Sequence, residues 1–234
     1  MNYLIFLCYL ILMSDIIYYP DITNNDFNKR LLSKKEFQDI KVKGQDKEIN
    51  TNFKLQPHQL FSKRFISPNT PYNGILLFHG TGSGKTCTAL TIAEQFKEQI
   101  KNTNKKVLVI APLNIQDNFI KEIYNFNKSD NEQCLKNVYS LGKISNIKTT
   151  DEKKRILKKK INKFYGFTGY SKFSNKFFNK IKISDIKDIK NEKLIKKIRK
   201  IYDNRIFIID EVHNLRRTNT DENTKLTSTI LAHI

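Results

Sequence analysis

The sequence predicts an α/β domain in which helices flank a mostly parallel sheet. Three apolar runs have the length and composition of buried strands, at 74–78, 107–110 and 206–209. Segments with a helical period of apolar residues lie between them, at 87–100, 114–126 and 151–164. Strands that alternate with helices are typical of a parallel sheet. We therefore expect residues 51–234 to form one such unit, preceded by an N-terminal extension at 1–50.

The first of these strands runs directly into a glycine-rich loop, GTGSGKT, which ends at Lys85 and Thr86. Glycine allows positive φ and has no Cβ, so successive backbone N–H groups can turn toward one anion. The next helix would point the positive end of its dipole at the same anion. Strand, loop, Gly-Lys-Thr and helix together form a phosphate-binding P-loop. The alternative is a Gly/Ser-rich turn that connects a strand to a helix.

The P-loop pattern predicts that this loop binds a nucleotide, with Mg²⁺ beside it. Lys85 would contact the β- and γ-phosphates, and the Thr86 hydroxyl would bind Mg²⁺. The strict pattern has glycine at the first position, where this chain has His79. The expected nucleotide contacts are His79, Gly80, Thr81, Gly82, Ser83, Gly84, Lys85 and Thr86.

The strand at 206–209 ends in two carboxylates, Asp210 and Glu211. In open α/β sheets, ligands bind at the carboxyl ends of the strands, where the P-loop also lies. Asp210 would hold Mg²⁺ through water, and Glu211 would orient or deprotonate the attacking water. Lys85, Asp210 and Glu211 are thus the predicted catalytic residues, and Thr86 and Asp210 the predicted metal ligands.

The chain is strongly basic, with a formal net charge of +19 over 234 residues. Such a charge suits a polyanionic partner, and nucleic acid is the first candidate. The excess of Lys, Asn and Ile also fits translation of an AT-rich genome, so both explanations stay open. The lysines of the amphipathic segment 151–164 have the same two interpretations, a solvated helix face or a contact with DNA.

The three cysteines, Cys8, Cys87 and Cys134, are far apart and form no C-x-x-C pair. This spacing predicts neither a disulfide framework nor a zinc site. A reducing, intracellular compartment is therefore expected.

The apolar run at 3–13 is too short to span a bilayer, and it lacks the basic residues and cleavage site of a signal peptide. No membrane partner is expected. Residues 1–12 are interpreted either as upstream sequence translated in error, with Met13 as the true start, or as a packed terminal segment. Weaker patterns predict strands at 138–141 and 165–168 and a Lys-rich helix at 184–202.

P-loop and Asp-Glu-Val-His together resemble the superfamily 2 helicase-type ATPases. The sequence at 55–86 and at 208–216 is similar to that of the helicases of large cytoplasmic DNA viruses. This branch is related to the poxvirus early transcription factor small subunit and nucleoside triphosphatase I. The resemblance implies a RecA-like ATP-binding lobe that uses ATP and Mg²⁺. It also implies that Gln59 reads the adenine edge, that Ala111, Pro112 and Leu113 touch the nucleic-acid backbone, and that His213 couples the two sites.

The resemblance covers roughly residues 15–220, and it implies a truncated lobe because no second-lobe motif follows. The expected function is Mg-ATP hydrolysis that drives movement on, or remodelling of, DNA, in viral transcription or DNA remodelling. The alternative is an inactive fragment or interaction module that binds ATP or nucleic acid without turnover. Expected partners are nucleic acid, a separate second-lobe polypeptide and viral transcription machinery, in the host cytoplasm or the virion.

Overall fold

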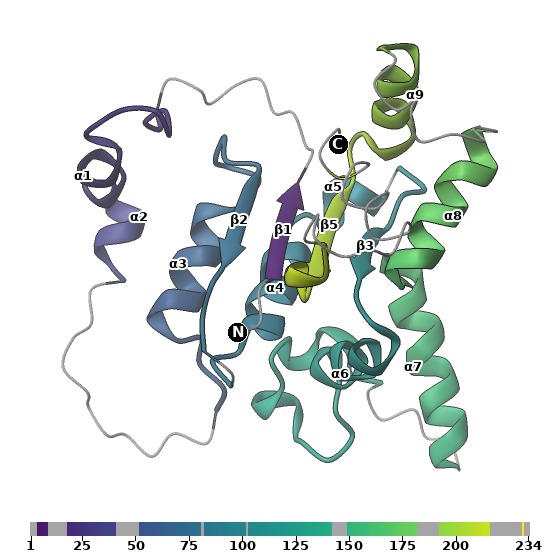
Figure 1. Ribbon diagram of the computed structural model, residues 1–234. Helices are drawn as coiled ribbons and strands as arrows, with labels where there is room; N and C mark the ends of the chain where they lie inside the picture. Colours follow the sequence, from purple (N-terminus) through teal and green to yellow (C-terminus); the bar gives the residue numbers. More distant parts are fainter. Residues whose placement is uncertain are drawn as a thin grey trace.

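The computed structural model describes residues 4–8, 18–40, 52–80, 82–101, 103–141, 149–181, 192–215 and 231. Its centre is a five-stranded sheet with the strand order β2-β1-β5-β3-β4 (Figure 1). The strands are β1 (Leu4–Cys8), β2 (Gly74–Leu77), β3 (Val107–Ile110), β4 (Tyr165–Thr168) and β5 (Ile206–Asp210). Among the helices described, none is long and apolar enough to span a membrane.

Four of the five strands run in the same direction. β3 pairs in parallel with both β4 and β5. β1 pairs antiparallel with β2 on one side and with β5 on the other, which gives β2 and β5 the same direction. The predicted α/β class with a mostly parallel sheet is confirmed, and so are the strands expected from the runs before the glycine loop, at 107–110 and before Asp210.

β1 is the exception to this parallel arrangement, and it lies between the strand that precedes the glycine loop and the strand that ends in Asp210. Leu4 is in register with Leu77 of β2 and with Asp210 of β5. A strand in this position supplies backbone partners to two neighbours that do not pair with each other. Residues 4–8 therefore belong to the sheet, while the proposed start at Met13 stays a prediction that the structure does not test.

The helices and short 3₁₀ turns surround this sheet (Figure 1). Their bounds are α1 (Phe27–Leu32), α2 (Lys35–Gln38), α3 (Pro57–Phe65), α4 (Lys85–Glu94), α5 (Lys97–Lys101), α6 (Leu113–Ile123), η1 (Asp130–Glu132), η2 (Lys136–Tyr139), α7 (Thr150–Phe164), α8 (Tyr170–Ile181), α9 (Glu192–Tyr202) and η4 (Val212–Leu215).

Most of the predicted helices are confirmed, but one helix and one strand differ from the expectation. The helix expected over 87–100 is divided into α4 and α5. The strand expected at 138–141 is wrong, because residues 136–139 form the 3₁₀ turn η2. Tyr139 packs its ring into the core from this turn and does not belong to a strand. The first part of the helix expected at 184–202 lies outside the described residues, and its later part is α9.

α4 is the helix on which the domain is packed. Every residue from Cys87 to Ala93 is buried, and this stretch is made of small or apolar side chains and two threonines. A helix that is buried all round must have neighbours on every side. α3 and α6 are two of these neighbours, and β1 is a third. The helix that begins at the glycine loop is therefore held rigidly by the core.

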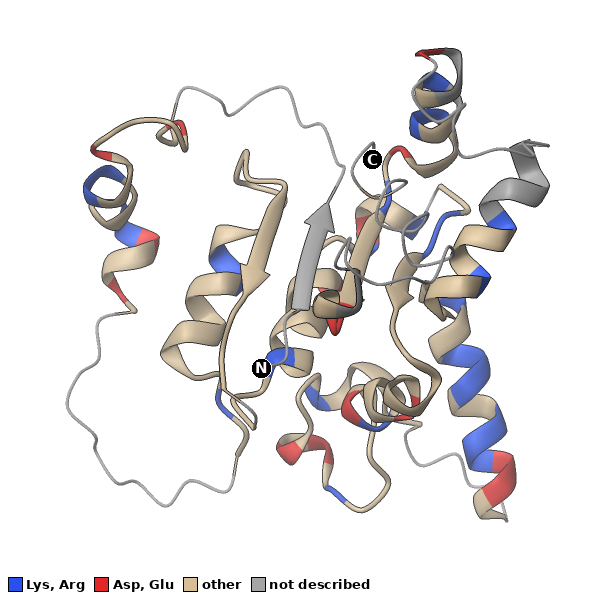
Figure 2. Ribbon diagram, viewed as in Figure 1, with Lys and Arg blue, Asp and Glu red and all other residues tan. Residues whose placement is uncertain are grey.

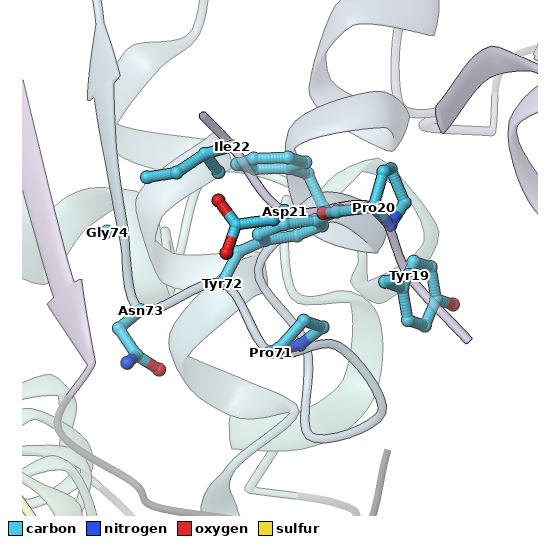
Figure 3. A pocket seen from close by; sticks show the side chains of 9 residues that line it. Tyr19, Pro20, Asp21, Ile22, Pro71, Tyr72, Asn73 and Gly74 are labelled. Carbon is cyan, nitrogen blue, oxygen red and sulfur yellow. The ribbon is translucent and has the colours of Figure 1, made fainter. Parts of the chain in front are cut away.

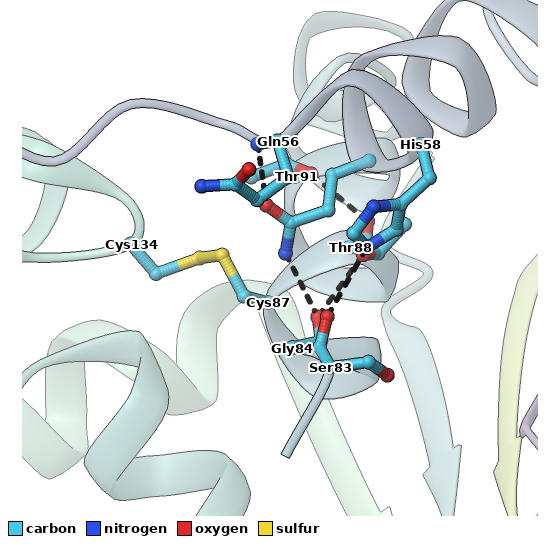
Figure 4. Close-up of a disulfide and its surroundings, with 9 residues drawn as sticks. Gln56, His58, Ser83, Gly84, Cys87, Thr88, Thr91 and Cys134 are labelled. Carbon is cyan, nitrogen blue, oxygen red and sulfur yellow. Dashed lines mark hydrogen bonds between the residues drawn. A yellow bond between two sulfur atoms is a disulfide. The ribbon is translucent and has the colours of Figure 1, made fainter. Parts of the chain in front are cut away.

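The structure contains a disulfide between Cys87 in the first turn of α4 and Cys134 between η1 and η2 (Figure 4). The expectation of no disulfide is therefore wrong. The two cysteines are 47 positions apart in the sequence, so their spacing alone gave no signal. Glu122 also lies close to both sulfur atoms, forming a possible three-ligand metal group, but sulfurs bonded to each other offer no thiolate to a metal.

An aromatic hollow lies at the amino end of β2, away from the glycine loop (Figure 3). Phe65 and Tyr72 stack there with ring centroids 4.3 Å apart, and Tyr19 meets Tyr72 edge-on. The Tyr72 hydroxyl donates to the carbonyl oxygen of Pro20 at 2.8 Å. These contacts attach the segment before α1 to the body of the domain.

Candidate nucleotide-binding site

The glycine loop has the backbone geometry that its sequence predicts. Gly82 and Gly84 have φ values of 76° and 78°, in the left-handed region that favours glycine. Gly84 is the N-cap of α4, so the loop passes directly into the helix at Lys85. Thr81, one of the predicted nucleotide contacts, lies outside the described residues.

The Lys85 side chain folds back over the loop. Its ammonium group donates to the carbonyl oxygen of His79 at 3.0 Å and to that of Gly80 at 2.9 Å. The Ser83 hydroxyl donates to the same Gly80 oxygen at 2.9 Å. The loop is thus curved around the lysine, whose cation is held by the carbonyl oxygens at the start of the loop.

Gln59 is buried against this loop from the side of α3. Its Oε1 accepts from the backbone N–H of Gln56 at 2.9 Å, and its Nε2 donates to the carbonyl oxygen of Gly84 at 3.2 Å (Figure 4). A Cβ at Gly84 would lie 2.4 Å from Gln59 Nε2. Gln59 therefore fastens α3 to the loop, a role that the sequence did not predict. Its reading of adenine stays a prediction.

Two histidines lie beside the loop. The rings of His58 and His79 have centroids 5.0 Å apart, and the His58 Nε2 atom is 3.2 Å from the carbonyl oxygen of Ser83. Burial lowers the pKa of His79, and the nearby His58 and Lys85 lower it further. His79 Nδ1 is a buried atom without a hydrogen-bond partner among the described residues. The lowered pKa favours the neutral form of the His79 ring beside the Lys85 cation.

Asp210 and Glu211 are each only 7% exposed at the end of β5. The pKa of Asp210 is raised to about 6, mainly by burial and also by the Glu211 carboxylate, while the hydrogen bond from the Glu211 N–H and the charge of Lys85 oppose this rise. Lys85 and Asp210 are thus close enough to interact, although they are 125 positions apart in the sequence. The sequence-predicted catalytic residues share one edge of the sheet.

Glu211 has an unusual backbone, with φ of 56°. Non-glycine residues rarely adopt this region, and such strain is found where the surrounding structure fixes a side chain for function. Glu211 Oε2 lies 3.0 Å from His213 Nδ1, close enough to pair with a protonated imidazole. Both atoms are buried and have no hydrogen-bond partner among the described residues, so this oxygen of Glu211 can still accept a hydrogen bond from a group outside them.

Tyr170 is a neighbour of the carboxylates that the sequence did not reveal. Its hydroxyl donates to the carbonyl oxygen of Asp210. Burial raises its pKa, and the charges of Asp210 and Glu211 raise it further, which keeps the hydroxyl protonated as a donor. The residue begins α8, a helix that lay between two recognised segments and carried no motif.

The three residues predicted to touch nucleic acid lie at the same carboxyl edge, after β3. Ala111 is fully buried, and its N–H donates to the carbonyl oxygen of Thr168 at 3.1 Å. Leu113, by contrast, is 78% exposed at the start of α6. Leu113 and the turn before it therefore form the accessible part of this segment. Contact with nucleic acid stays a prediction.

Replacing Asp210 by asparagine is expected to stabilise the fold at pH 7.5. Because the folded state raises the pKa from 3.8 to about 6, it binds the proton more tightly than the unfolded chain. Stability therefore falls as pH rises from about 4 to about 6, and the ionised carboxylate then costs about 3 kcal/mol. Asparagine removes that cost and the pH dependence.

Urea unfolding at pH 7.5 and pH 5 checks this expectation, with the exposed Asp117→Asn as the matched control. The free energy of unfolding of Asp210→Asn should exceed that of wild type by about 1–3 kcal/mol at pH 7.5, and the difference should shrink toward pH 5. A variant less stable than wild type at pH 7.5 would contradict the conclusion that the buried, ionised Asp210 carboxylate destabilises the fold.

Comparison with known proteins gives the family. The model of the SNF2-related domain matches residues 29–233. A protein of Acanthamoeba polyphaga mimivirus that carries the name of an ATP-dependent RNA helicase is 34% identical over 234 residues, covering 84% of this chain and 19% of that protein. No solved structure matches the chain at a comparable level of significance.

Further relatives come from other large DNA viruses. A protein named as a helicase of Invertebrate iridescent virus 3 is 32% identical, covering 86% of this chain and 19% of that protein. An early transcription factor large subunit homologue of African swine fever virus is 30% identical, covering 53% of this chain and 13% of that protein. The chain therefore spans less than a fifth of the length of these relatives. With the glycine loop, the Asp-Glu strand end and the family match together, the chain belongs to the SNF2-related family and is similar to the N-terminal helicase lobe of viral superfamily 2 proteins.

Proposed function

We propose that this chain is the ATP-binding lobe of a nucleic-acid-dependent ATPase, of the helicase type, that acts in viral transcription or DNA remodelling. The observation that carries the proposal is that the Lys85 cation acts on the buried carboxylate of Asp210, which is followed directly by the buried Glu211, at one edge of the sheet. A cation in a glycine loop and an acidic pair at the end of another strand of the same sheet are the groups that phosphoryl transfer from Mg-ATP requires.

The site residues fit Mg-ATP on three observations. The left-handed glycines Gly82 and Gly84 turn the loop in the way that lets its N–H groups face a phosphate. Glu211 Oε2 is buried and has no hydrogen-bond partner among the described residues, with His213 Nδ1 3.0 Å away, and burial raises the free energy of the ionised Asp210, a cost that a divalent cation would relieve. Carboxylate and hydroxyl oxygens are also the ligands that Mg²⁺ prefers.

Each residue has a defined role in this proposal. The loop N–H groups and Lys85 hold the β- and γ-phosphates. Thr86 and Asp210 would hold Mg²⁺, which when bound neutralises charge on the phosphate oxygens. Glu211 orients the attacking water and accepts its proton, and its fixed backbone keeps the carboxylate in place. Tyr170 positions the Asp210 backbone through its hydrogen bond.

The partners and location follow from the relatives and the charge of the chain. The names of the relatives point to nucleic acid and to transcription machinery. The net charge of +19 supports a nucleic-acid partner, which we propose to be DNA. A second lobe, in the same or a separate polypeptide, would complete the enzyme. Relatives from large DNA viruses support the host cytoplasm or the virion as its location.

ATP turnover by residues 1–234 is expected to be slow. Lys85 is the only Lys or Arg among the described residues of the site, and an additional arginine at the γ-phosphate raises phosphoryl transfer by about 10³–10⁵ in related enzymes. Steady-state phosphate release with and without DNA measures the turnover, and Glu211→Gln is the blank. A turnover near one per second, lost in Glu211→Gln, would show that this segment is a complete enzyme. Turnover equal in both proteins would remove Glu211 from catalysis.

A further inference from the structure

The edge of the sheet opposite the glycine loop carries a basic hollow of about 600 Å³. It lies between α5, the loop before β3 and the last turns of α7, and among the described residues Glu98 is the only acidic side chain that lines it. The lysines that line it are Lys97, Lys101, Lys105, Lys106, Lys160 and Lys163. We call this set, together with the residues of the adjoining groove described next, the basic hollow.

A second, more open groove continues the hollow along α7. It shares Lys106 and Lys163 with the first and adds Arg155, Lys158 and Lys159. Figure 2 shows Lys and Arg recurring along α7, whereas its only acidic residues are in the first turn. From Arg155 to Lys163 the helix rises about 12 Å, which spans three or four phosphates of one nucleic-acid strand.

Few of these cations are neutralised by carboxylates. Lys105, Lys106 and Lys160 donate to backbone carbonyl oxygens, of Asp203, Asn162 and Ser140 respectively, which orient the ammonium groups without cancelling their charge. Lys97 pairs with Glu94, and Lys101 with the exposed Glu98. Glu94 is itself shared, because it also accepts from the hydroxyls of Tyr139 and Tyr165.

Buried rings fix the position of two lysines. The Lys97 ammonium lies 4.6 Å from the ring centroid of Tyr139 and 5.2 Å from that of Phe164, and Lys160 lies 5.6 Å from Tyr139. Burial lowers the pKa of Lys160, and the nearby charge of Lys97 lowers it further. Both rings are less than a tenth exposed, so they hold cations and cannot stack on bases.

We propose that the basic hollow binds the phosphate backbone of nucleic acid, as a surface separate from the nucleotide loop and from the turn at Leu113. The sequence left the lysines of α7 open between a solvated face and a nucleic-acid contact. Their convergence with α5 and the loop before β3, around a hollow with one acidic side chain, favours the second. Binding through phosphates alone is independent of base sequence and strongly dependent on salt.

This proposal deepens the nucleic-acid part of the proposed function and is independent of its nucleotide part. The test is fluorescence anisotropy with a labelled 20-base-pair duplex and a 20-nucleotide single strand, at several salt concentrations. The hollow variant is Lys158→Glu with Lys163→Glu. Its matched control, Lys29→Glu with Lys35→Glu, changes the net charge equally at exposed positions of α1 and α2.

The hollow variant should bind at least tenfold more weakly than wild type, and the slope of log affinity against log salt should fall by about 1.5–2. The control should change affinity less than threefold. Milder Lys158→Gln with Lys163→Gln should give an intermediate loss. Equal losses in hollow and control variants would overturn the proposal, because the net charge alone would then explain binding; so would unchanged binding in the hollow variant.

Lys85→Ala separates this result from the nucleotide site. It should leave oligonucleotide binding unchanged while it weakens binding of Mg-ATP. If Mg-ATP displaced the oligonucleotide from wild type and not from Lys85→Ala, the oligonucleotide would lie at the glycine loop and the proposed location would be wrong. Loss of ATP binding by wild type, with oligonucleotide binding intact, would instead contradict only the nucleotide part of the proposed function.

Discussion

Replacing Lys85 by alanine is expected to lower the affinity for Mg-ATP by at least tenfold. The Lys85 ammonium lies over the loop, within 3.0 Å of two backbone carbonyl oxygens, where the β- and γ-phosphates are expected. A charge-assisted contact to phosphate contributes about 1.5–3 kcal/mol, which corresponds to a tenfold or greater loss. Isothermal titration calorimetry measures this affinity directly.

The control for this variant is Lys54→Ala, which removes one charge at an exposed position before α3. Its affinity for Mg-ATP should equal that of wild type. Equal affinities for wild type and Lys85→Ala would show that the loop does not bind the phosphates through this lysine. Equal melting temperatures of the two proteins without nucleotide would confirm that the comparison reports binding and not unfolding.

Deleting residues 1–12 is expected to abolish the native fold. β1 pairs with β2 and β5 at once, so its removal leaves β2 without a strand partner among the described strands and leaves one side of β5 unpaired. Each buried, unsatisfied N–H or C=O group costs about 1–3 kcal/mol. Several such groups together approach the total stability of a domain, about 5–15 kcal/mol.

Circular dichroism during thermal unfolding measures this effect. Deletion of residues 1–3 alone is the matched control, because it keeps β1, and it should retain a cooperative transition. A chain that begins at Met13 and melts like wild type would show that β1 is dispensable. That outcome would support translation from Met13, one of the two interpretations of residues 1–12.

The sequence predicted the sheet class, most of the helices and the groups at the carboxyl edge, because each depends on local pattern. A buried strand reads as a short apolar run, and the glycine loop and the Asp-Glu pair carry their chemistry in adjacent residues. The strand at 165–168 was also predicted from the residues themselves and is β4.

What the sequence could not predict depends on contacts between distant residues. Cys87 and Cys134 give no pairing signal at their separation, and Tyr170 reaches Asp210 only because α8 begins beside the end of β5. The contact of Gln59 with Gly84 also could not be predicted, because it depends on how α3 packs on α4. β1 was missed as a sheet member because an apolar run does not show which strands it will join.

The most direct test of the nucleotide site is a crystal structure of residues 1–234 with Mg²⁺ and a non-hydrolysable ATP analogue. We predict the γ-phosphate within hydrogen-bonding distance of Lys85 Nζ and of the N–H groups at the start of α4, with the metal bound by Thr86 and facing Asp210. Phosphates held by the basic hollow, or anywhere else away from the glycine loop, would contradict it.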